Sequence, residues 1–459
     1  MPLEKIEICG FRGFNKRQAL DLSIPNKKPG SGLTIITGAN NSGKSSIIEC
    51  LKVRGGRQSP SFAVGARNAS VDFVEIKYFV DGEEESVVSL RKGGSETKKN
   101  KINGNFHIFV LPSRRAFNPF FIKAGGPVQS REQYLDNIQL SAQRSSTMDS
   151  FSYRLFGIVE KQEAFNKILH RVLTFKPEWS IDQSDQGQYF LKFHNGEFSH
   201  TSDGMGEGVV SIFGIVDSLY DSKPGDVIVI DEPELSLHPA LQRRVFDLLK
   251  DFSKDRQIII STHSPYFVDV PSIINGSNLV RVVNTGKGTE IFQLSRQARN
   301  VLKKLSKGNL YNPHTFGLDA RELFFQEDGV VVVEGQEDVL LFPDVASQLE
   351  TAITGSFFGW GAGGASNIEH VCFFLKDLGF KKVAAILDGD KAEEIPKLKS
   401  KYPGYHFVHI CADDIRTKRA RKETEAVDGL LDDNRIIKSE HKEHTLQLIQ
   451  KLNQYMDSL

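Results

Sequence analysis

The sequence predicts an α/β protein with two parallel-sheet domains in succession, and two observations predict it. Buried-type strands alternate with amphipathic helices over most of the 459 residues, a pattern typical of parallel sheets. Acidic residues directly follow buried strands in two separate places, at 231–232 and at 388–390. Open α/β sheets present their chemistry at the carboxyl ends of their strands. We therefore expect one site in each half of the chain.

The composition is that of a globular protein, with 39% hydrophobic and 25% charged residues. Lys+Arg and Asp+Glu both number 58, so any surface for nucleic acid must be local. The sequence begins without a signal-peptide pattern and contains no apolar run near the ~20 residues that span a bilayer. We expect a cytoplasmic protein with no membrane partner. Its scattered cysteines suggest reduced thiols: Cys9, Cys50, Cys372 and Cys411.

The first half of the chain is predicted to be mainly strands, with a helical region in its middle. The expected strands are a hairpin at 3–24 and single strands at 33–37, 71–80, 86–91 and 106–111, followed by turns and strand at 178–198. A polar, Lys-rich loop is expected at 93–103 and helices at 128–172 and 206–220. Residues 226–269 then predict a buried strand (227–230), an amphipathic helix and a second buried strand (258–261), and 279–294 predict a hairpin.

The composition changes after residue 327, and the boundary before a second domain is expected within 300–327. The predicted elements there are strand 329–335, helix 339–349, a Gly-rich loop at 356–364, helix 367–378 and strand 383–387. The expected domains are 1–300 with a helical lobe at about 115–200, a helical linker at 301–327, a second α/β domain at 328–430 and a helical tail at 431–459.

A phosphate-binding motif follows the strand at 33–37. Residues 38–45 read GANNSGKS, which matches G-x-x-x-x-G-K-[ST] between a strand and a helix. Glycines let backbone N–H groups approach phosphate oxygens, the helix N-terminus and Lys44 add positive charge, and Ser45 would ligate Mg²⁺. The expected contacts with ATP are Gly38, Asn40, Asn41, Ser42, Gly43, Lys44, Ser45 and Ser46.

Residues at the ends of two later strands would complete that site. Asp231 is expected to help hold Mg²⁺, and Glu232 to orient or deprotonate the attacking water. His263 follows the neighbouring strand and is placed to contact the γ-phosphate. The alternative is that the acids are solvated turn residues and the histidine is structural.

These motifs resemble those of a known group of ATPases. DEPELSLHPALQ followed by IIISTHSPYF is similar to the ABC-type ATPases of the SMC and RecF group, and most closely to the OLD (overcoming lysogenisation defect) family. IEICGFRGF resembles that family's opening hairpin. The resemblance implies an ABC-type P-loop ATPase domain with a helical lobe.

A weaker resemblance concerns the loop before the helix at 206–220. Residues 202–206 (SDGMG) resemble the signature loop, which in these ATPases reaches the γ-phosphate bound by the other subunit. The resemblance implies ATP sites shared across a dimer, with Ser202 and Gly204 as nucleotide contacts. Gln58 is the candidate Q-loop residue.

A second group of acids follows two buried strands in the second half. Glu334 and Asp338 come after one strand, and Asp388 and Asp390 come after the other. Carboxylates at the ends of parallel strands would gather, and hard divalent cations with oxygen ligands offset such charge. One or two Mg²⁺ or Mn²⁺ ions there would activate water and stabilise the leaving oxygen of a phosphodiester. Two unrelated acidic turns are the alternative.

This second pattern resembles a TOPRIM domain, and residues 321–342 (RELFFQEDGVVVVEGQEDVLLF) are similar to the OLD-family entry into it. The resemblance implies a small Rossmann-like nuclease domain in which Glu334, Asp338, Asp388 and Asp390 are metal ligands. A lysine commonly assists the scissile phosphate in these nucleases. Lys418 is the candidate, and Lys391 is the alternative. The basic run at 416–422 either tracks a phosphate backbone or is a solvated surface.

Together these features predict an ATP-binding and hydrolysing, metal-dependent endonuclease of OLD type in antiphage defence, whose ATPase dimer gates the TOPRIM site. The expected partners are nucleic acid (DNA favoured over RNA), further copies of the chain in a dimer or higher homo-oligomer, and a defence partner such as a reverse transcriptase with its RNA/DNA product. The alternative is an SMC/RecF-like DNA-binding ATPase whose TOPRIM domain serves binding or partner recruitment. The sequence leaves open whether ATP activates or restrains cleavage.

Overall fold

The computed structural model describes the chain except for residues 56–61, 63–65, 90–96, 103–105, 107, 114–119, 122–150, 202–206, 307–316, 326–327, 421–424 and 459. The chain divides into two compact units, Met1–Ile291 and Phe292–Leu459. Among the described residues, no helix combines the length and apolar character that a membrane crossing requires.

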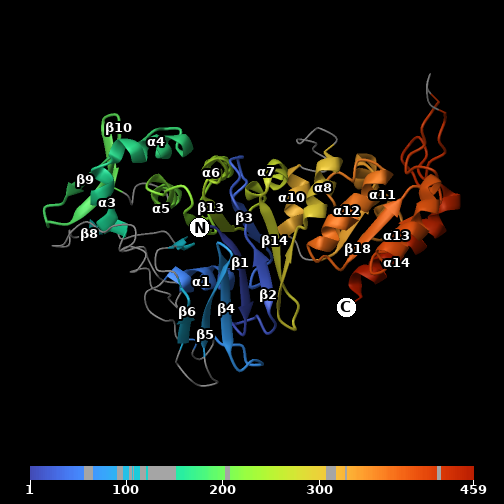
Figure 1. The fold of residues 1–459 in the computed structure, drawn as a ribbon. Helices are drawn as coiled ribbons and strands as arrows, with labels where there is room; N and C mark the ends of the chain where they lie inside the picture. The colour runs from blue at the N-terminus through green and yellow to red at the C-terminus, as the bar shows by residue number, and fades with distance from the viewer. Residues whose placement is uncertain are drawn as a thin grey trace. The chain divides into compact units, whose positions relative to one another are not determined.

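The first unit is organised around a six-stranded sheet in the order β15-β14-β3-β13-β12-β7 (Figure 1). Its five parallel strands are β3 (Leu33–Thr37), β7 (Ile108–Leu111), β12 (Val227–Asp231), β13 (Gln257–Ser261) and β14 (Asn278–Asn284), with β15 (Thr289–Gln293) at the edge. Every residue of β3, β7 and β13 is buried, which explains their continuous apolar sequences. The strands predicted at 33–37, 227–230 and 258–261 are confirmed.

The helix that follows the phosphate-binding motif lies between two sheets. This helix, α1 (Lys44–Gly55), packs against β7, β12 and β13 (Figure 1). On its other side, the Tyr78 hydroxyl donates to the Cys50 carbonyl. Tyr78 belongs to an antiparallel sheet in the order β2-β1-β4-β5-β6. Its strands are β1 (Leu3–Cys9), β2 (Gln18–Asp21), β4 (Val74–Val80), β5 (Glu83–Ser89) and β6 (Thr97–Asn100).

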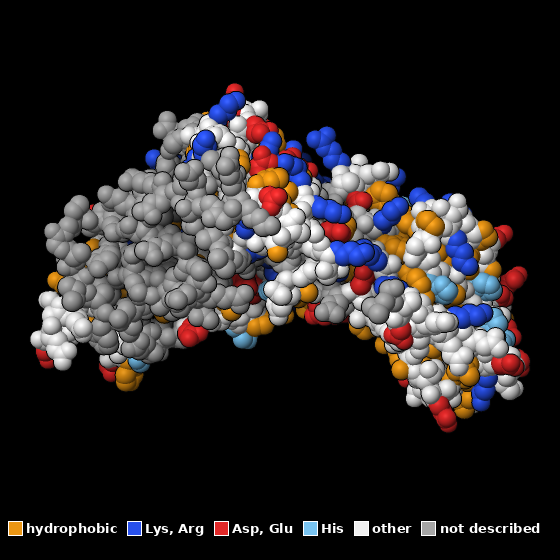
Figure 2. Space-filling model, turned by 90° about the horizontal axis from the view of Figure 1, so that it is seen from below, with side chains coloured by type: hydrophobic (Ala, Val, Ile, Leu, Met, Phe, Trp, Pro, Cys, Tyr) orange, Lys and Arg blue, Asp and Glu red, His pale blue; other side chains and the backbone are white. Residues whose placement is uncertain are grey.

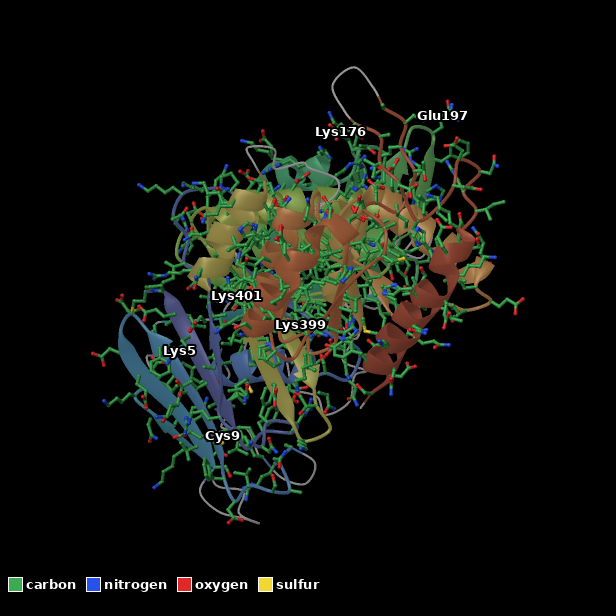
Figure 3. The ribbon with its side chains drawn as sticks, turned by 90° about the vertical axis from the view of Figure 1, so that its right-hand side faces the viewer. Lys5, Cys9, Lys176, Glu197, Lys399 and Lys401 are labelled. Carbon is green, nitrogen blue, oxygen red and sulfur yellow. The ribbon has the colours of Figure 1, made fainter. Side chains whose placement is uncertain are left out.

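The antiparallel sheet confirms the predicted hairpin and corrects one predicted loop. β1 pairs with β2, and Figure 3 labels two residues of β1, Lys5 near its start and Cys9 at its end. The polar segment at 93–103, predicted as loop, contains β6, which pairs with β5. Its sequence, TKKN, has no apolar residue because β6 is an edge strand with alternating half-buried and exposed side chains. A strand that buries no apolar face gives no alternation signal.

The lobe between β7 and β12 combines helices with a small sheet. Its elements are α3 (Phe151–Val159), α4 (Gln162–Val172), β8 (Phe120–Phe121), β9 (Glu178–Gln183), β10 (Tyr189–Asn195) and β11 (Phe198–Thr201), and α5 (Glu207–Tyr220) leads back to β12. Trp179 contacts Phe165 and Phe213 edge-on, with ring centroids 5.8 and 5.3 Å apart. The prediction of helix at 128–172 is confirmed for 151–172, and residues 128–150 lie outside the described chain.

The second unit contains a four-stranded parallel sheet in the order β17-β16-β18-β19. Its strands are β16 (Val330–Val333), β17 (Ser356–Phe357), β18 (Val383–Leu387) and β19 (His406–His409). The helices of this unit are α8 (Arg296–Leu305), α10 (Leu318–Glu322), α11 (Gln336–Gln348), α12 (Ala365–Asp377), α13 (Ile395–Lys401) and α14 (Lys442–Asp457). Lys399 and Lys401, labelled in Figure 3, belong to α13. The core joins Val331 and Ile386 of the sheet to Leu448 and Leu452 of α14.

Several short helices complete the described chain. They are η2 (Pro265–Phe267), η3 (Leu323–Phe325), η4 (Gly389–Glu394), η5 (Ser439–His441) and α7 (Val270–Asn275), and the longer α6 (Pro239–Phe252) connects β12 with β13. On the face drawn in Figure 2, Lys and Arg side chains are mixed with Asp and Glu side chains over the described surface. This mixing agrees with the equal counts of basic and acidic residues.

Candidate functional sites

The phosphate-binding loop lies between β3 and α1 in a conformation that requires glycine at two positions. Gly38 and Gly43 have φ of 140° and 115°, a region that L side chains rarely adopt. A Cβ on Gly38 would lie 2.2 Å from the Val282 carbonyl oxygen, and one on Gly43 would lie 2.9 Å from Cγ2 of Thr289. The loop therefore stays close to β14 and β15 while its backbone turns into the helix.

Lys44 lies at the start of α1 and is buried at the edge of the sheet. Its Nζ donates to the carbonyl oxygens of Gly38 and Ala39, both at 2.9 Å. Burial lowers the pKa of Lys44 to about 8, whereas the carboxylates of Glu232 and Asp231 act in the opposite direction. An anion at this edge would add favourable charge and favour the protonated amine.

Asp231 and Glu232 lie where β12 ends beside β13. Asp231 pairs in register with Ser261 and accepts a hydrogen bond from the Ser261 hydroxyl. Glu232 has a φ of 47°, and its N–H donates to the Ser261 carbonyl at 2.9 Å. The end of β13 therefore fixes the backbone that carries both acids.

His263 lies opposite Glu232, with Nε2 3.9 Å from Oε1 of Glu232. Burial lowers the pKa of His263, and the charge of Lys44 lowers it further. Both effects favour the neutral imidazole, which has one nitrogen that donates and one that accepts. The structure thus brings Lys44, Asp231, Glu232 and His263 to one edge, as the sequence predicted.

Not every predicted nucleotide contact can be located. Ser45 lies in the first turn of α1 with an exposed side chain, whereas Ser42 and Ser46 are buried. Asn40 and Asn41 are exposed on the loop. Ser202, Gly204 and Gln58 lie outside the described residues.

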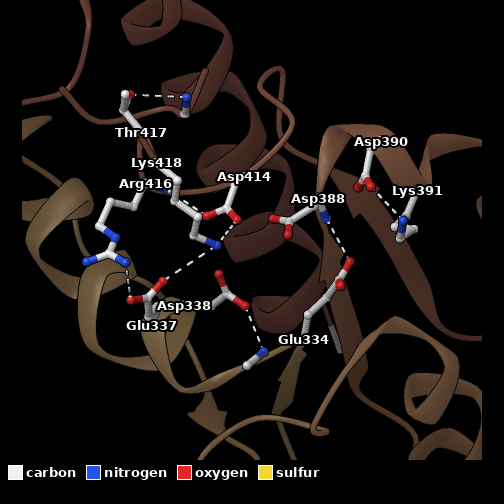
Figure 4. A network of polar contacts seen from close by, with 12 residues as sticks. Glu334, Glu337, Asp338, Asp388, Asp390, Lys391, Asp414, Arg416, Thr417 and Lys418 are labelled. Carbon is white, nitrogen blue, oxygen red and sulfur yellow. Dashed lines mark hydrogen bonds and ion pairs between the residues drawn. The ribbon is translucent and has the colours of Figure 1, made fainter. Parts of the chain in front are cut away.

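The second group of acids lies at the carboxyl ends of β16 and β18 (Figure 4). Glu334 directly follows β16, and its Oε1 accepts a hydrogen bond from the Asp388 N–H at 3.0 Å. Asp338 lies in the first turn of α11, where its Oδ2 accepts from the Gly335 N–H at 2.8 Å. The carboxylates of Asp338, Asp388 and Asp414 turn toward one another in Figure 4.

Burial and mutual repulsion make these acids hard to ionise together. Burial raises the pKa of Asp388 to about 8, and the neighbouring charges of Asp338 and Glu334 add to this effect. Burial raises the pKa of Asp338 to about 6, and that of Glu334 is also raised. A divalent cation would relieve this repulsion, and a donor set of carboxylate oxygens is the type that Mg²⁺ and Mn²⁺ prefer.

The acids are clustered but not assembled into a coordination shell. Across the described part of the chain, no three His, Cys, Asp or Glu side chains stand close enough to hold a metal ion. Asp390 points away toward Lys391, whose Nζ lies 2.5 Å from Oδ2 of Asp390, and its side chain is exposed. The cluster fits a cation in its chemistry, and its side chains would have to move to surround one.

Lys418 lies at the edge of this acid cluster. Its ammonium pairs with Asp414 and lies 3.7 Å from Oε2 of Glu337. Arg416 pairs with the same Glu337 at 2.8 Å. These basic residues of the run at 416–422 therefore face the acids of their own unit (Figure 4).

Sequence reasoning missed two acids that the structure brings to these edges. Glu234 accepts hydrogen bonds from the loop after β13, and its signal was a third acid in DEPE. Asp414 joins the second cluster, and its signal was the spacing of four residues to Lys418. Neither acid directly follows a predicted strand, so the strand-end argument passed over both.

The fold and the first edge define a P-loop ATPase domain. A family model described as "AAA domain, putative AbiEii toxin, Type IV TA system" matches residues 33–269, which include β3, α1, β12 and β13. The chain belongs to this family.

Several proteins with assigned names are similar to this chain in sequence. The chain is 25% identical over 304 residues to the Septu protein PtuA of Bacillus thuringiensis, covering 60% of this chain and 74% of that one. It is 28% identical over 208 residues to the endonuclease GajA of Bacillus cereus, covering 44% of this chain and 33% of that one. It is 41% identical over 86 residues to the OLD nuclease of Thermus scotoductus, covering 17% and 16%. The chain is therefore similar to ATPase/nuclease proteins of the OLD type.

A solved structure of an SMC head bound to the C-winged helix domain of ScpA also aligns with the chain. The TM-score is 0.42 at 16% identity, and the alignment covers 65% of this chain and 98% of that one.

Proposed function

We propose that this protein is an ATP-controlled, metal-dependent endonuclease of OLD type that acts in defence against phage. The observation that carries the proposal is the pair of acid-bearing strand edges in one chain. One edge adjoins a phosphate-binding loop, and the other carries carboxylates with raised pKa values. Three of the matched relatives are named nucleases, which supports nuclease activity for the protein as a whole.

At the first edge, ATP would bind with its phosphates on the loop and on Lys44. Ser45 and Asp231 would hold the accompanying Mg²⁺, whose charge supports the β- and γ-phosphates. Glu232 would orient water and accept its proton as the water oxygen attacks the γ-phosphorus and the bond to the β-phosphate oxygen breaks. His263 would donate a hydrogen bond to a γ-phosphate oxygen.

The second edge is proposed to be a TOPRIM nuclease site. Glu334, Asp338, Asp388 and Asp390 would hold one or two Mg²⁺ or Mn²⁺ ions, and Asp414 would join them. Such ions activate water and stabilise a leaving oxygen. Lys418 would neutralise the phosphate at the cut, with Lys391 as the alternative.

The ATPase is proposed to gate the nuclease through a dimer. A nucleotide that binds one dimer geometry better than another shifts the population toward it, and the second site would follow that shift. The signature loop at 202–206, with Ser202 and Gly204, would meet the nucleotide of the other subunit. A dimer or higher homo-oligomer, cytoplasmic and acting on DNA in preference to RNA, is part of this proposal.

Two further hypotheses concern a defence partner and a purely DNA-binding role. A reverse transcriptase with its RNA/DNA product, or another defence protein, stays a prediction, and a pull-down of associated protein and nucleic acid would test it. The alternative of a purely DNA-binding ATPase is not favoured, because a binding module has no need of a cluster of metal-compatible carboxylates.

Plasmid cleavage with Mg²⁺ or Mn²⁺ tests the nuclease assignment. We expect the wild-type protein to nick the plasmid. The double variant Asp388→Ala, Asp390→Ala should lose at least about 100-fold, since removing residues that act as a unit abolishes most of the rate. The exposed pair Lys397→Ala, Lys399→Ala on α13 serves as a matched control. Retained cleavage in the aspartate variant would contradict the assignment of the second edge as a nuclease site.

A further inference from the structure

A third acid in the turn after β12 holds the loop after β13. Glu234 is the second glutamate of the sequence DEPE, two residues beyond Glu232. Its Oε2 accepts a hydrogen bond from the Thr262 hydroxyl at 2.8 Å, and its Oε1 accepts one from the His263 N–H at 2.6 Å. Both oxygens of one carboxylate therefore hold the segment that carries His263.

The contact is extended by a chain of hydrogen bonds that returns to the same turn. The Ser264 N–H donates to the Thr262 hydroxyl at 3.0 Å, and the Ser264 hydroxyl donates to Oε1 of Gln242 at 2.6 Å. Gln242 in turn donates to the Leu237 carbonyl at 2.8 Å. The turn after β12, the start of α6 and the loop after β13 thus form one hydrogen-bonded unit.

Two features make the relative position of the Glu232 and His263 side chains depend on the surrounding backbone. Glu232 adopts a φ of 47°, and a non-glycine residue persists in this region only where its surroundings over-determine it. His263 follows a strand end, and its Nε2 lies 3.9 Å from Oε1 of Glu232. A shift of either backbone segment would change the separation of these two side chains.

We propose that Glu234 is a positioning residue of the ATP site, which fixes the His263 backbone against the turn that carries Glu232. The proposal rests on the hydrolysis of ATP at this edge, as proposed above. Glu234 does not touch the nucleotide in this account. Its two oxygens are already occupied by Thr262 and His263, and burial raises the pKa of its carboxyl while the hydrogen bonds from His263 and Thr262 oppose that rise.

Two substitutions separate a positioning role from a chemical one. Glu234→Ala removes both hydrogen bonds and leaves the His263 N–H without its acceptor. Glu234→Gln keeps both, because the amide oxygen can accept from the His263 N–H while the amide nitrogen donates to the Thr262 hydroxyl. A carboxylate that acted as general base would be lost in both variants.

The first readout is steady-state ATP hydrolysis. We expect kcat of Glu234→Ala to fall about 100-fold, the size of effect that follows from misplacing a catalytic group by 1 Å. We expect its KM for ATP to stay within about threefold of wild type, since uniform binding is not altered. Glu234→Gln should recover kcat to within about fivefold of wild type. Glu197→Ala, in the exposed turn between β10 and β11 (Figure 3), controls for loss of a glutamate elsewhere.

The second readout needs no turnover. Hydrogen–deuterium exchange of the peptide that contains His263 should be faster in Glu234→Ala and close to wild type in Glu234→Gln. Equal exchange in all three proteins, or wild-type kcat in Glu234→Ala, overturns the inference. A Glu234→Gln variant as inactive as Glu232→Gln overturns it too, because the carboxylate itself would then be required. If wild type hydrolysed no ATP, the proposed function would fail while the exchange measurement still decided whether Glu234 fixes this loop.

Discussion

The two acidic edges differ in the positive charge that each has close by. At the first edge, Lys44 lies among Asp231 and Glu232, and the pKa of Lys44 reflects their attraction as well as its burial. At the second edge, Lys418 is paired with Asp414, while Asp388 is surrounded by acids. The first edge is thus prepared for an anion, and the second for a cation.

The raised pKa of Asp388 predicts a pH-dependent stability in the absence of divalent ions. An unfolded aspartate has a pKa of about 3.9, and the folded one has a pKa of about 8. Between these values the folded state binds more protons, so stability falls as pH rises through that window. We expect thermal melting in EDTA at pH 6 and pH 8 to show this fall in wild type and a smaller fall in Asp388→Asn.

The control for that measurement is Asp344→Asn, which changes an exposed aspartate of α11 outside the cluster. Added Mg²⁺ or Mn²⁺ should raise the melting temperature of wild type at pH 8 more than that of Asp388→Asn. An identical pH dependence in the two variants and wild type would contradict the account of the cluster.

At the residue scale, motifs with fixed spacing were predictable and tertiary partners were not. The loop glycines, Lys44, Asp231, Glu232 and His263 follow strands that are recognisable by their apolar runs, so their common edge could be inferred. Asp414 reaches its cluster from a segment without regular structure. No periodic pattern in the sequence predicts that Asp414 lies near the other acids.

At the scale of elements, the helix of the phosphate-binding motif is fixed to the antiparallel sheet by a buried ion pair. Arg54, in the last turn of α1, makes two hydrogen bonds to the Glu85 carboxylate of β5, at 2.7 and 2.8 Å. The exposed fractions of the two side chains are 0% and 3%. This bidentate contact ties the end of α1 to β5, which suggests that the sheet sets the direction of the helix and hence the position of Lys44.

We expect Arg54→Met to lower the free energy of unfolding by about 3–5 kcal/mol, because it leaves the buried Glu85 carboxylate without its arginine. Urea denaturation would measure this. Arg171→Met, which breaks an exposed pair with Asp251, should cost less than about 1 kcal/mol. Equal stability of the two variants would show that the buried pair is not what holds α1 to its sheet.

Elements were predictable where the chain buries one face or both faces, as in β3, β13 and β18. Elements were missed where the segment consists mainly of polar residues. β6 reads as a loop because it is an edge strand, and the pair α13 and β19 went unnoticed after the strand at 383–387. In β19, the histidines at both ends of HFVH weaken the apolar run.

At the scale of the whole molecule, two parallel sheets with acidic edges occupy one chain. The family assignment covers 33–269, which is the ATPase part. The composition change after residue 327 indicated a second domain, and the chain divides into two compact units between residues 291 and 292. The predicted linker at 301–327 overlaps the end of α8, whose Leu302 and Leu305 are buried.

The central claim is that the ATP site controls the nuclease site, and one measurement tests it most directly. Plasmid cleavage rates would be compared at saturating ATP for wild type, Glu232→Gln and Lys44→Ala. Glu232→Gln should bind ATP, hydrolyse it poorly and change the cleavage rate without altering any residue of the second edge. Cleavage that is the same in all three proteins would contradict the claim, because the two sites would then act independently.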